Sequence, residues 1–248
     1  MRKVLFYTII ITLAQVIPNN LRGQSCGFGC LGLSGIYGGY SFQEYDANNL
    51  SDYLRISNPS NIETPEFSKG NGFKLGANIF RAKFDGFFIS AKGFYQFLEE
   101  NYEVEVNAGA LQKEKYEFST NYFGFGLDFG IDIVDVISLK LLEGGLTFHD
   151  AELKVTNTYF DTSVQDISLK FTNDKLRIGY YLGTGLILHL IQDYVSIEGT
   201  AFFSFYNIDN LSRESVNNDI VYLLPEDSKT ISSGGFGASV QLNIGFPF

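Results

Sequence analysis

The 248-residue chain carries 28 acidic and 18 basic residues, a formal net charge of −10, which excludes nucleic acid as an expected partner because phosphate backbones recruit basic surfaces. It contains 26 glycines and many phenylalanines and tyrosines but only five prolines, and amphipathic helical stretches are nearly missing. This profile favours a single all-β domain with many turns.

Residues 1–24 have the parts of a secretory signal peptide. Arg2 and Lys3 form a short basic region, residues 4–16 are largely apolar, and a polar stretch follows. The apolar run is too short and too quickly interrupted for a spanning helix, and a buried N-terminal helix is the alternative. Cleavage near residue 24 would remove Arg2, Lys3 and Arg22 and change the net charge from −10 to −13.

Residues 25–30 are predicted to form a short periplasmic segment that holds both cysteines. Cys26 and Cys30 would form a small disulfide there, because the periplasm is oxidising. A zinc site would need two more ligands nearby, and the sequence supplies none. Lipidation of Cys26 is the alternative, although Gly23 stands where a lipobox has an apolar residue.

Residues 31–248 divide into eight segments with strand character. The predicted strands are 31–44, 71–83, 87–106, 114–134, 136–156, 167–191, 194–207 and 230–248. The tight junctions between them are 84–86, 134–136 and 192–194, and the long polar ones are 45–70, 107–113, 157–166 and 208–229. Short turns that alternate with long loops are typical of an eight-stranded antiparallel up-and-down transmembrane barrel, with the turns in the periplasm and the loops outside.

Apolar residues alternate with glycine and polar residues along these strands. In the last strand, apolar residues from Phe236 to Phe248 alternate with small or polar ones. An apolar face of this length is tall enough to cross a bilayer as a tilted strand. We therefore expect apolar side chains outside and polar ones inside, the reverse of a lipocalin-like barrel. The apolar face switches near Leu98 and Thr120, which indicates bulges or points where strands leave the membrane.

Charged residues on the polar face must point inward, because an Arg or Lys at the lipid midplane costs roughly 2–4 kcal/mol. They are Lys92, Asp128, Asp132, Lys140, Glu143, Arg177 and Glu198. The interior of eight strands is only wide enough for side chains, and inward glycines leave space for these longer residues. We expect a paired network that plugs the lumen, since unpaired buried ions are costly. A narrow ion path is the alternative.

The outer loops are acidic, which indicates a solvated surface bridged by divalent cations beside lipopolysaccharide. A helix is predicted over residues 49–56, with Asn48 as its N-cap. Leu50, Tyr53 and Leu54 would share one side of this helix. That patch would either pack over the barrel mouth or contact a partner protein. Aromatic residues such as Tyr40 and Tyr95, where strands meet loops, are expected to form interfacial girdles.

Catalytic, cofactor and metal sites are not predicted. His189 is expected to be a structural hydrogen-bonding residue. Lipid A deacylases among the eight-stranded barrels carry a His-x-Ser pair on one strand, whereas His149 is followed two residues later by Ala151. The palmitoyltransferase type has an N-terminal amphipathic helix, for which residues 25–30 are too short. A lipid-A-modifying enzyme, with His149 as its candidate, is a second alternative to a non-enzymatic barrel.

The signal peptide, the eight alternating segments and the terminal phenylalanine resemble small outer-membrane barrels of the OmpA/OmpX type. Ile244, Phe246 and Phe248 resemble the signal read by the barrel-assembly machinery. In size and signal the chain is also similar to PorT-like barrels of the gliding and type nine secretion machinery. The resemblance implies an integral protein of the Gram-negative outer membrane, in contact with its lipid and lipopolysaccharide and with another envelope protein. It favours a structural or accessory subunit.

Overall fold

The computed structural model describes residues 34–57, 65–84, 86–108, 111–159, 165–192, 194–214, 219–225 and 227–246. The predicted signal peptide, the cysteine pair Cys26 and Cys30, and Phe248 lie outside these residues and stay predictions. No helix within these ranges is long and apolar enough to cross a membrane.

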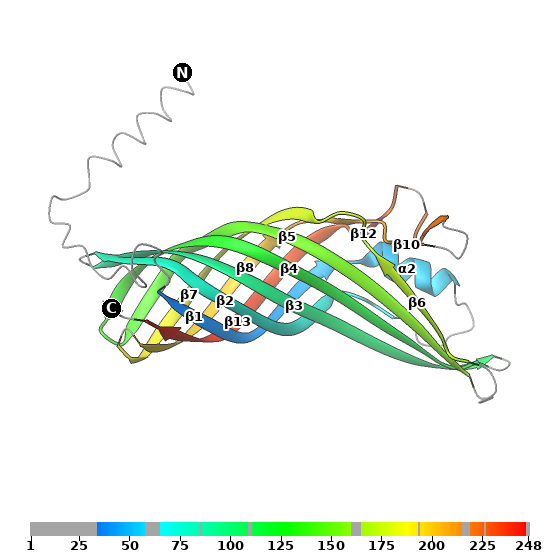
Figure 1. The fold of residues 1–248 in the computed structure, drawn as a ribbon, viewed down its shortest axis with the longest axis horizontal. Coiled ribbons are helices and arrows are strands. Elements are labelled where there is room, and N and C mark those ends of the chain that lie inside the picture. Colours follow the sequence, from blue (N-terminus) through cyan, green and yellow to red (C-terminus); the bar gives the residue numbers. More distant parts are fainter. Residues whose placement is uncertain are drawn as a thin grey trace, which may run out of the picture.

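Eight antiparallel strands close into a ring (Figure 1). They are β1 (Gly35–Asp46), β2 (Lys69–Phe84), β3 (Phe87–Ala108), β4 (Leu111–Val134), β5 (Ile137–Tyr159), β7 (Arg177–Ile191), β8 (Val195–Phe205) and β13 (Ser233–Gly245). Each strand pairs with the next ring strand along the chain, and β13 pairs with β1 to close the circle. The predicted eight-stranded up-and-down barrel is confirmed.

The predicted loop at 107–113 is instead the end of a tall hairpin. β3 and β4 pair as far as Ala108 and Leu111, and β5 follows β4 to the same height. The polar residues of this segment were expected to end the strands. Instead, side chains of opposite charge pair across the two strands in water, as Lys113 Nζ does with Glu103 Oε1. Figure 1 shows these three strands extending past the rest of the ring.

The predicted strand 167–191 is broken into β6 (Ile167–Thr172) and β7, and both pair with β5. Asn173 spans the break. Its backbone N–H donates to the carbonyl of Ala151 (3.3 Å), and its side-chain Oδ1 accepts from the Ala151 N–H (2.7 Å). A side chain thus replaces one backbone partner where the chain passes from the extracellular sheet into the ring.

A cap covers the extracellular end of the ring (Figure 1). It consists of α2 (Asn48–Ser57) and the short strands β9 (Ile208–Asp209), β10 (Ser212–Glu214), β11 (Ile220–Tyr222) and β12 (Lys229–Ile231). β9 pairs with β12, while β10 and β11 continue the barrel sheet beyond β6. The predicted helix is present, but Asn48 is its first helical residue, and Asp46 Oδ1 accepts from the Asn48 N–H (3.1 Å).

The outer face of the ring is an apolar belt. On β4, Phe125, Leu127 and Phe129 point outward and are 41–63% exposed. From Phe123 to Ile133 the strand rises about 33 Å, or about 23 Å along the membrane normal at a tilt of about 45°. This height is close to the roughly 25 Å apolar band of outer-membrane barrels. The belt is therefore the lipid-facing surface.

The polarity of the two faces inverts above the belt while the strand alternation continues. Leu98 and Thr120 both point inward and are each 2% exposed, in phase with the inward residues below them. Beyond this level the outward residues, such as Glu103, face water, and inward residues such as Phe118 build an apolar core. Of the two explanations for the switch in the sequence, the exit from the membrane is correct and a bulge is not.

Candidate functional site: the closed lumen

A network of charged side chains fills the middle of the lumen. Lys92 Nζ lies 2.5 Å from Glu143 Oε1 and 3.1 Å from Asp128 Oδ1. Lys140 pairs with Glu143 and with Glu198. These five residues come from β3, β4, β5 and β8, and none is more than 6% exposed. Five of the seven predicted lumen charges therefore meet, and they bind together strands from opposite sides of the ring.

Neutral side chains supply further partners to this network. Ser90 Oγ donates to Asp128 Oδ2 (3.1 Å), and Asn243 Nδ2 donates to Glu198 Oε2 (3.3 Å). Lys140 Nζ donates to Thr200 Oγ1 (3.0 Å). Because buried ions are tolerated only when they are paired and hydrogen-bonded, these contacts explain how so much charge is held in a closed space.

A β-bulge in β5 brings Lys140 and Glu143 to the same side. Strict alternation would send residues three apart to opposite faces. The register of β5 shifts between Lys140 and Glu143 relative to β7, and both intervening leucines, Leu141 and Leu142, are exposed on the lipid side. Thr184 Oγ1 on β7 donates to the Lys140 carbonyl (2.5 Å) and stabilises the bulged backbone.

Asp132 and Arg177 are not part of the network, which corrects their prediction as lumen charges. Asp132 is exposed near the turn between β4 and β5, where its Oδ1 accepts from Ser138 Oγ (2.5 Å). Arg177 begins β7 at the extracellular end and pairs with Asp209, and its side chain is 36% exposed. Both have the inward phase of their strands, but they lie at the ends of the barrel, where water reaches the interior.

Lys74 is an interior cation that the sequence analysis did not select. It is 2% exposed, and its Nζ lies 4.3 Å from the centre of the Phe94 ring and 5.8 Å from that of Phe202. Aromatic faces attract cations, so the rings take the place of a carboxylate here. Its position in the polar phase of β2, beside Gly76, was the available signal.

Aromatic rings form a second layer of the plug. Tyr37, Phe94, Tyr181 and Phe202 are buried and contact one another inside the ring. The inward glycines were expected to make room for charges, but most of them make room for rings. Phe94 lies directly opposite Gly124, where a Cβ atom would come within 2.5 Å of Phe94 Cζ. The same holds for Tyr37 opposite Gly76 and for Phe202 opposite Gly237.

Neither histidine has the setting of a catalytic group. His149 is 1% exposed and stacks on Tyr206, with ring centres 3.8 Å apart, while its Nε2 contacts Thr147 Oγ1 (2.8 Å). His189 Nε2 contacts Ser138 Oγ (2.7 Å), but the neighbouring Asp132 bonds to the serine and Ser138 is fully buried. A Ser-His-Asp triad needs an accessible serine and an aspartate that orients the histidine. Within the described ranges no three His, Cys, Asp or Glu residues are grouped to hold a metal ion.

The predicted patch of Leu50, Tyr53 and Leu54 packs onto the barrel mouth. Leu50 is fully buried and Leu54 is 5% exposed, and both join an apolar core that includes Phe118 and Leu153 on the inner wall of the sheet. Tyr53 packs against the same core. Of the two alternatives for this patch, packing over the barrel mouth is the one that the structure shows for Leu50 and Leu54, while Tyr53 stays partly exposed.

The loop between β1 and β2 (loop one) is also held to the barrel wall by Glu100 on β3. The Glu100 Oε2 atom accepts from Tyr45 Oη (2.6 Å) and from the backbone N–H groups of Ser68 and Lys69 (3.0 Å each). Burial and the adjacent carboxylate raise the pKa of Tyr45 well above its usual range, so this phenol stays a donor. Both ends of the described part of loop one are thus held to β3.

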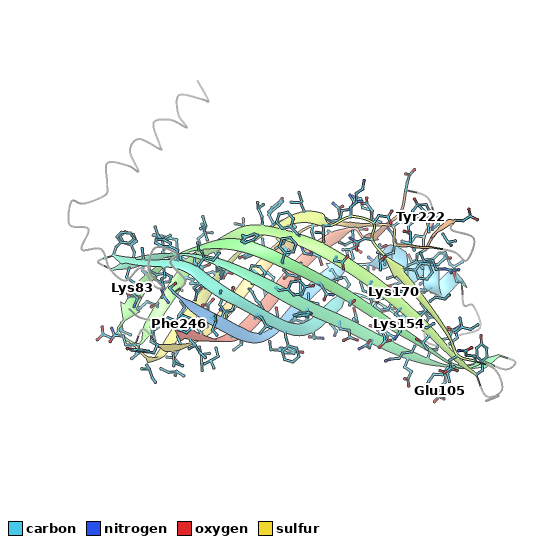
Figure 2. All side chains as sticks on the ribbon, in the orientation of Figure 1. Lys83, Glu105, Lys154, Lys170, Tyr222 and Phe246 are labelled. Atoms are coloured by element: carbon cyan, nitrogen blue, oxygen red, sulfur yellow. The ribbon has the colours of Figure 1, made fainter. Side chains whose placement is uncertain are left out.

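The part of the sheet above the apolar belt, here called the head, carries paired charges on its outer wall. Glu117 on β4 accepts from Lys115 (2.6 Å) and lies 3.1 Å from Lys154 Nζ on β5. These hydrogen bonds to Lys115 and Lys154 lower the pKa of Glu117. Lys170 Nζ on β6 lies 2.8 Å from Glu152 Oε2. Figure 2 shows Lys154 and Lys170 on this wall.

An eight-stranded ring with an apolar exterior and a buried polar interior defines the class. The protein has the fold of a small eight-stranded outer-membrane β-barrel, and its apolar belt makes it an integral membrane protein. It has long extracellular strands and a closed lumen.

Comparisons with known proteins give similarities among solved structures. No family model matches the chain, and no curated protein matches it in sequence. Neisserial surface protein A is 11% identical with a TM-score of 0.45, covering 86% of this chain and 96% of that one. Ail, the attachment invasion locus protein of Yersinia pestis, is 14% identical with a TM-score of 0.38, covering 87% and 97%. The outer membrane protease OmpT from Escherichia coli is 13% identical with a TM-score of 0.38, covering 86% and 94%.

Proposed function

We propose that the protein is a non-enzymatic barrel that serves as a structural or accessory subunit of an envelope or secretion machine. The observation that carries this proposal is the buried network of Lys92, Lys140 and their three carboxylates across the lumen. An ion path would need water beside these groups, whereas their partners are other side chains. A barrel without a path can act only through its surfaces.

Two apolar clusters next to the charge network support the same function. The aromatic layer around Phe94 and Phe202 lies beside the charges, and the cap core around Leu50 covers the mouth. An enzyme acting on lipid A would need a reactive group open to the outer leaflet. His149, its candidate, is buried, stacks on Tyr206 and contacts the tilted ring of Tyr122.

We further propose that the aromatic girdle contacts outer-membrane lipid and lipopolysaccharide, and that the barrel-assembly machinery recognises the last strand. Ile244 on β13 is 44% exposed on the lipid side, which suits a signal read from outside the barrel. A PorT-like role in secretion is one form of the accessory function.

Conductance in planar bilayers tests the closed lumen. We expect the refolded mature protein to give no stable unitary currents under conditions in which a general porin conducts. Affinity purification of the protein from a detergent extract of cells should yield specific envelope proteins. Stable currents that disappear in Asp128→Asn would overturn the proposal and assign a channel instead.

A further inference from the structure

An open slot runs along the edge of β6 at the extracellular end. It encloses about 660 Å³ and is lined by Ser168, Leu169 and Lys170 on one side and by Arg213 and Ile220 on the other. Successive residues of a strand point to opposite faces. A slot that touches Ser168, Leu169 and Lys170 therefore lies along the strand edge, where backbone N–H and C=O groups are presented.

The hydrogen-bond pattern shows which backbone groups face the slot. The N–H of Asn173 bonds to Ala151 on β5, and β6 continues in the same antiparallel register. Alternate residues of an antiparallel strand bond to one neighbour, so the backbone groups of Lys170 and Ser168 point away from β5. Thr172 has the same phase and pairs with Ser212 on β10, which is the one β6–β10 pairing of the described residues.

The slot also holds the guanidinium group of Arg213 in an acidic protein. The Arg213 guanidinium lies 5.7 Å from the centre of the Phe171 ring, and its buried Nε has no hydrogen-bond partner among the described residues. Asp174, the carboxylate beside it, already accepts from Ser212 Oγ (2.8 Å). Ile220 and Tyr222 on β11 add exposed apolar surface, and Figure 2 marks Tyr222 at this end.

We propose that this slot binds an extended acidic peptide segment of a partner protein, which adds to the β6 edge as a further strand. Main-chain hydrogen bonds to Ser168 and Lys170 provide affinity, and Arg213 provides the preference for a carboxylate. The inference deepens the proposed accessory function by naming the contact surface, and it is tested without reference to conductance.

The test uses the full barrel in lipid nanodiscs and a phage-displayed library of random nonapeptides. Lys170→Pro removes one N–H that faces the slot and leaves the N–H groups that face β5, and proline is tolerated on edge strands. Lys170→Thr is the matched control, since it loses the same side chain but keeps the N–H. We expect the wild type and Lys170→Thr to enrich peptides that alternate β-branched residues and contain Asp or Glu. Lys170→Pro should bind these peptides about tenfold more weakly, as for the loss of one backbone hydrogen bond.

A second variant and a modified probe make the result independent of folding defects. Arg213→Gln should remove the preference for Asp and Glu while the alternating pattern persists. A selected peptide with N-methyl groups along one edge should lose binding to the unmodified barrel. The proposal is overturned if no peptide is enriched, if Lys170→Pro binds as the wild type does, or if the methylated peptide still binds. Self-association of the barrel through this edge, seen by sedimentation, would also overturn it in favour of a second copy.

Discussion

Lys140 is one of the two cations that balance the three buried carboxylates of the lumen network. Its ammonium group pairs with both Glu143 and Glu198 and is fully buried. The Thr184 hydroxyl on the lipid side bonds to its carbonyl, so backbone and side chain are fixed by different strands. Removing one partner of a buried ion pair leaves the other as an uncompensated charge, which costs more than the pair contributed.

We expect Lys140→Met to lower the free energy of unfolding by about 3–5 kcal/mol, because Glu198 loses its nearest cation and Glu143 keeps only Lys92. Urea unfolding in detergent, followed by the gel mobility shift of folded barrels, measures this. Lys154→Met is the matched control, since Lys154 is 46% exposed in a surface pair with Glu117 and should change stability little. Equal effects of the two substitutions would show that the interior pairing does not stabilise the barrel.

The sequence was sufficient to select five of the charges in this network but not the way they meet. Inward phase and the cost of charge in lipid are local properties, and they identified Lys92 and Glu198 correctly. The bulge that aligns Lys140 with Glu143 depends on pairing with β7, which no short segment reveals. Lys74 was missed for a related reason, since its partners are rings on other strands.

At the level of strands, glycine and aromatic residues are paired across the ladder. Phe94 on β3 faces Gly124 on β4, and the absence of a side chain at Gly124 lets the ring lie against the backbone. The register of each hairpin therefore decides whether the plug packs. Sequence alternation predicted both strands, but only the register shows which ring lies over which glycine.

We expect Gly124→Ala to destabilise the barrel by about 1–3 kcal/mol, the usual cost of overpacking, because the new Cβ would lie 2.5 Å from Phe94 Cζ. Gly199→Ala is the control, since no atom lies within 4 Å of a Cβ at that position. Thermal unfolding of both variants in the same detergent makes the comparison. Adding Phe94→Leu to Gly124→Ala should restore part of the loss, and a failure to do so would contradict the pairing.

The whole molecule consists of two halves with opposite polarity on one continuous sheet. In the membrane half the apolar side chains face outward, and in the head they face inward around Leu50, Phe118 and Leu153. The sequence predicted the strand count and the turns because alternation is a local signal. It placed the tip of the β3–β4 hairpin a few residues too low, at 107–113, because a charged strand end resembles a loop when its cross-strand partners are unknown.

We expect Leu50→Asp to open the cap without unfolding the ring, because the cap core and the lumen plug are separate clusters. A charge in place of this fully buried leucine should cost the cap at least about 3 kcal/mol. Hydrogen exchange with mass spectrometry should show faster exchange in α2 and unchanged exchange in the membrane-spanning parts of β3 and β4, since only the upper parts of these strands contribute residues such as Val104 and Phe118 to the cap core. Ile56→Asp, at a residue 74% exposed, should leave both unchanged. Loss of protection throughout the ring would contradict the separation.

The height of the β3–β4 hairpin has a consequence for biogenesis. Its upper part bears charges on the outer face, among them Glu99, Glu103 and Glu105, and it must reach the far side of a bilayer whose interior rejects such groups. Moving these carboxylates across the apolar layer costs free energy that the short turns at the other end do not incur, so we expect transfer of this hairpin to limit insertion of the barrel.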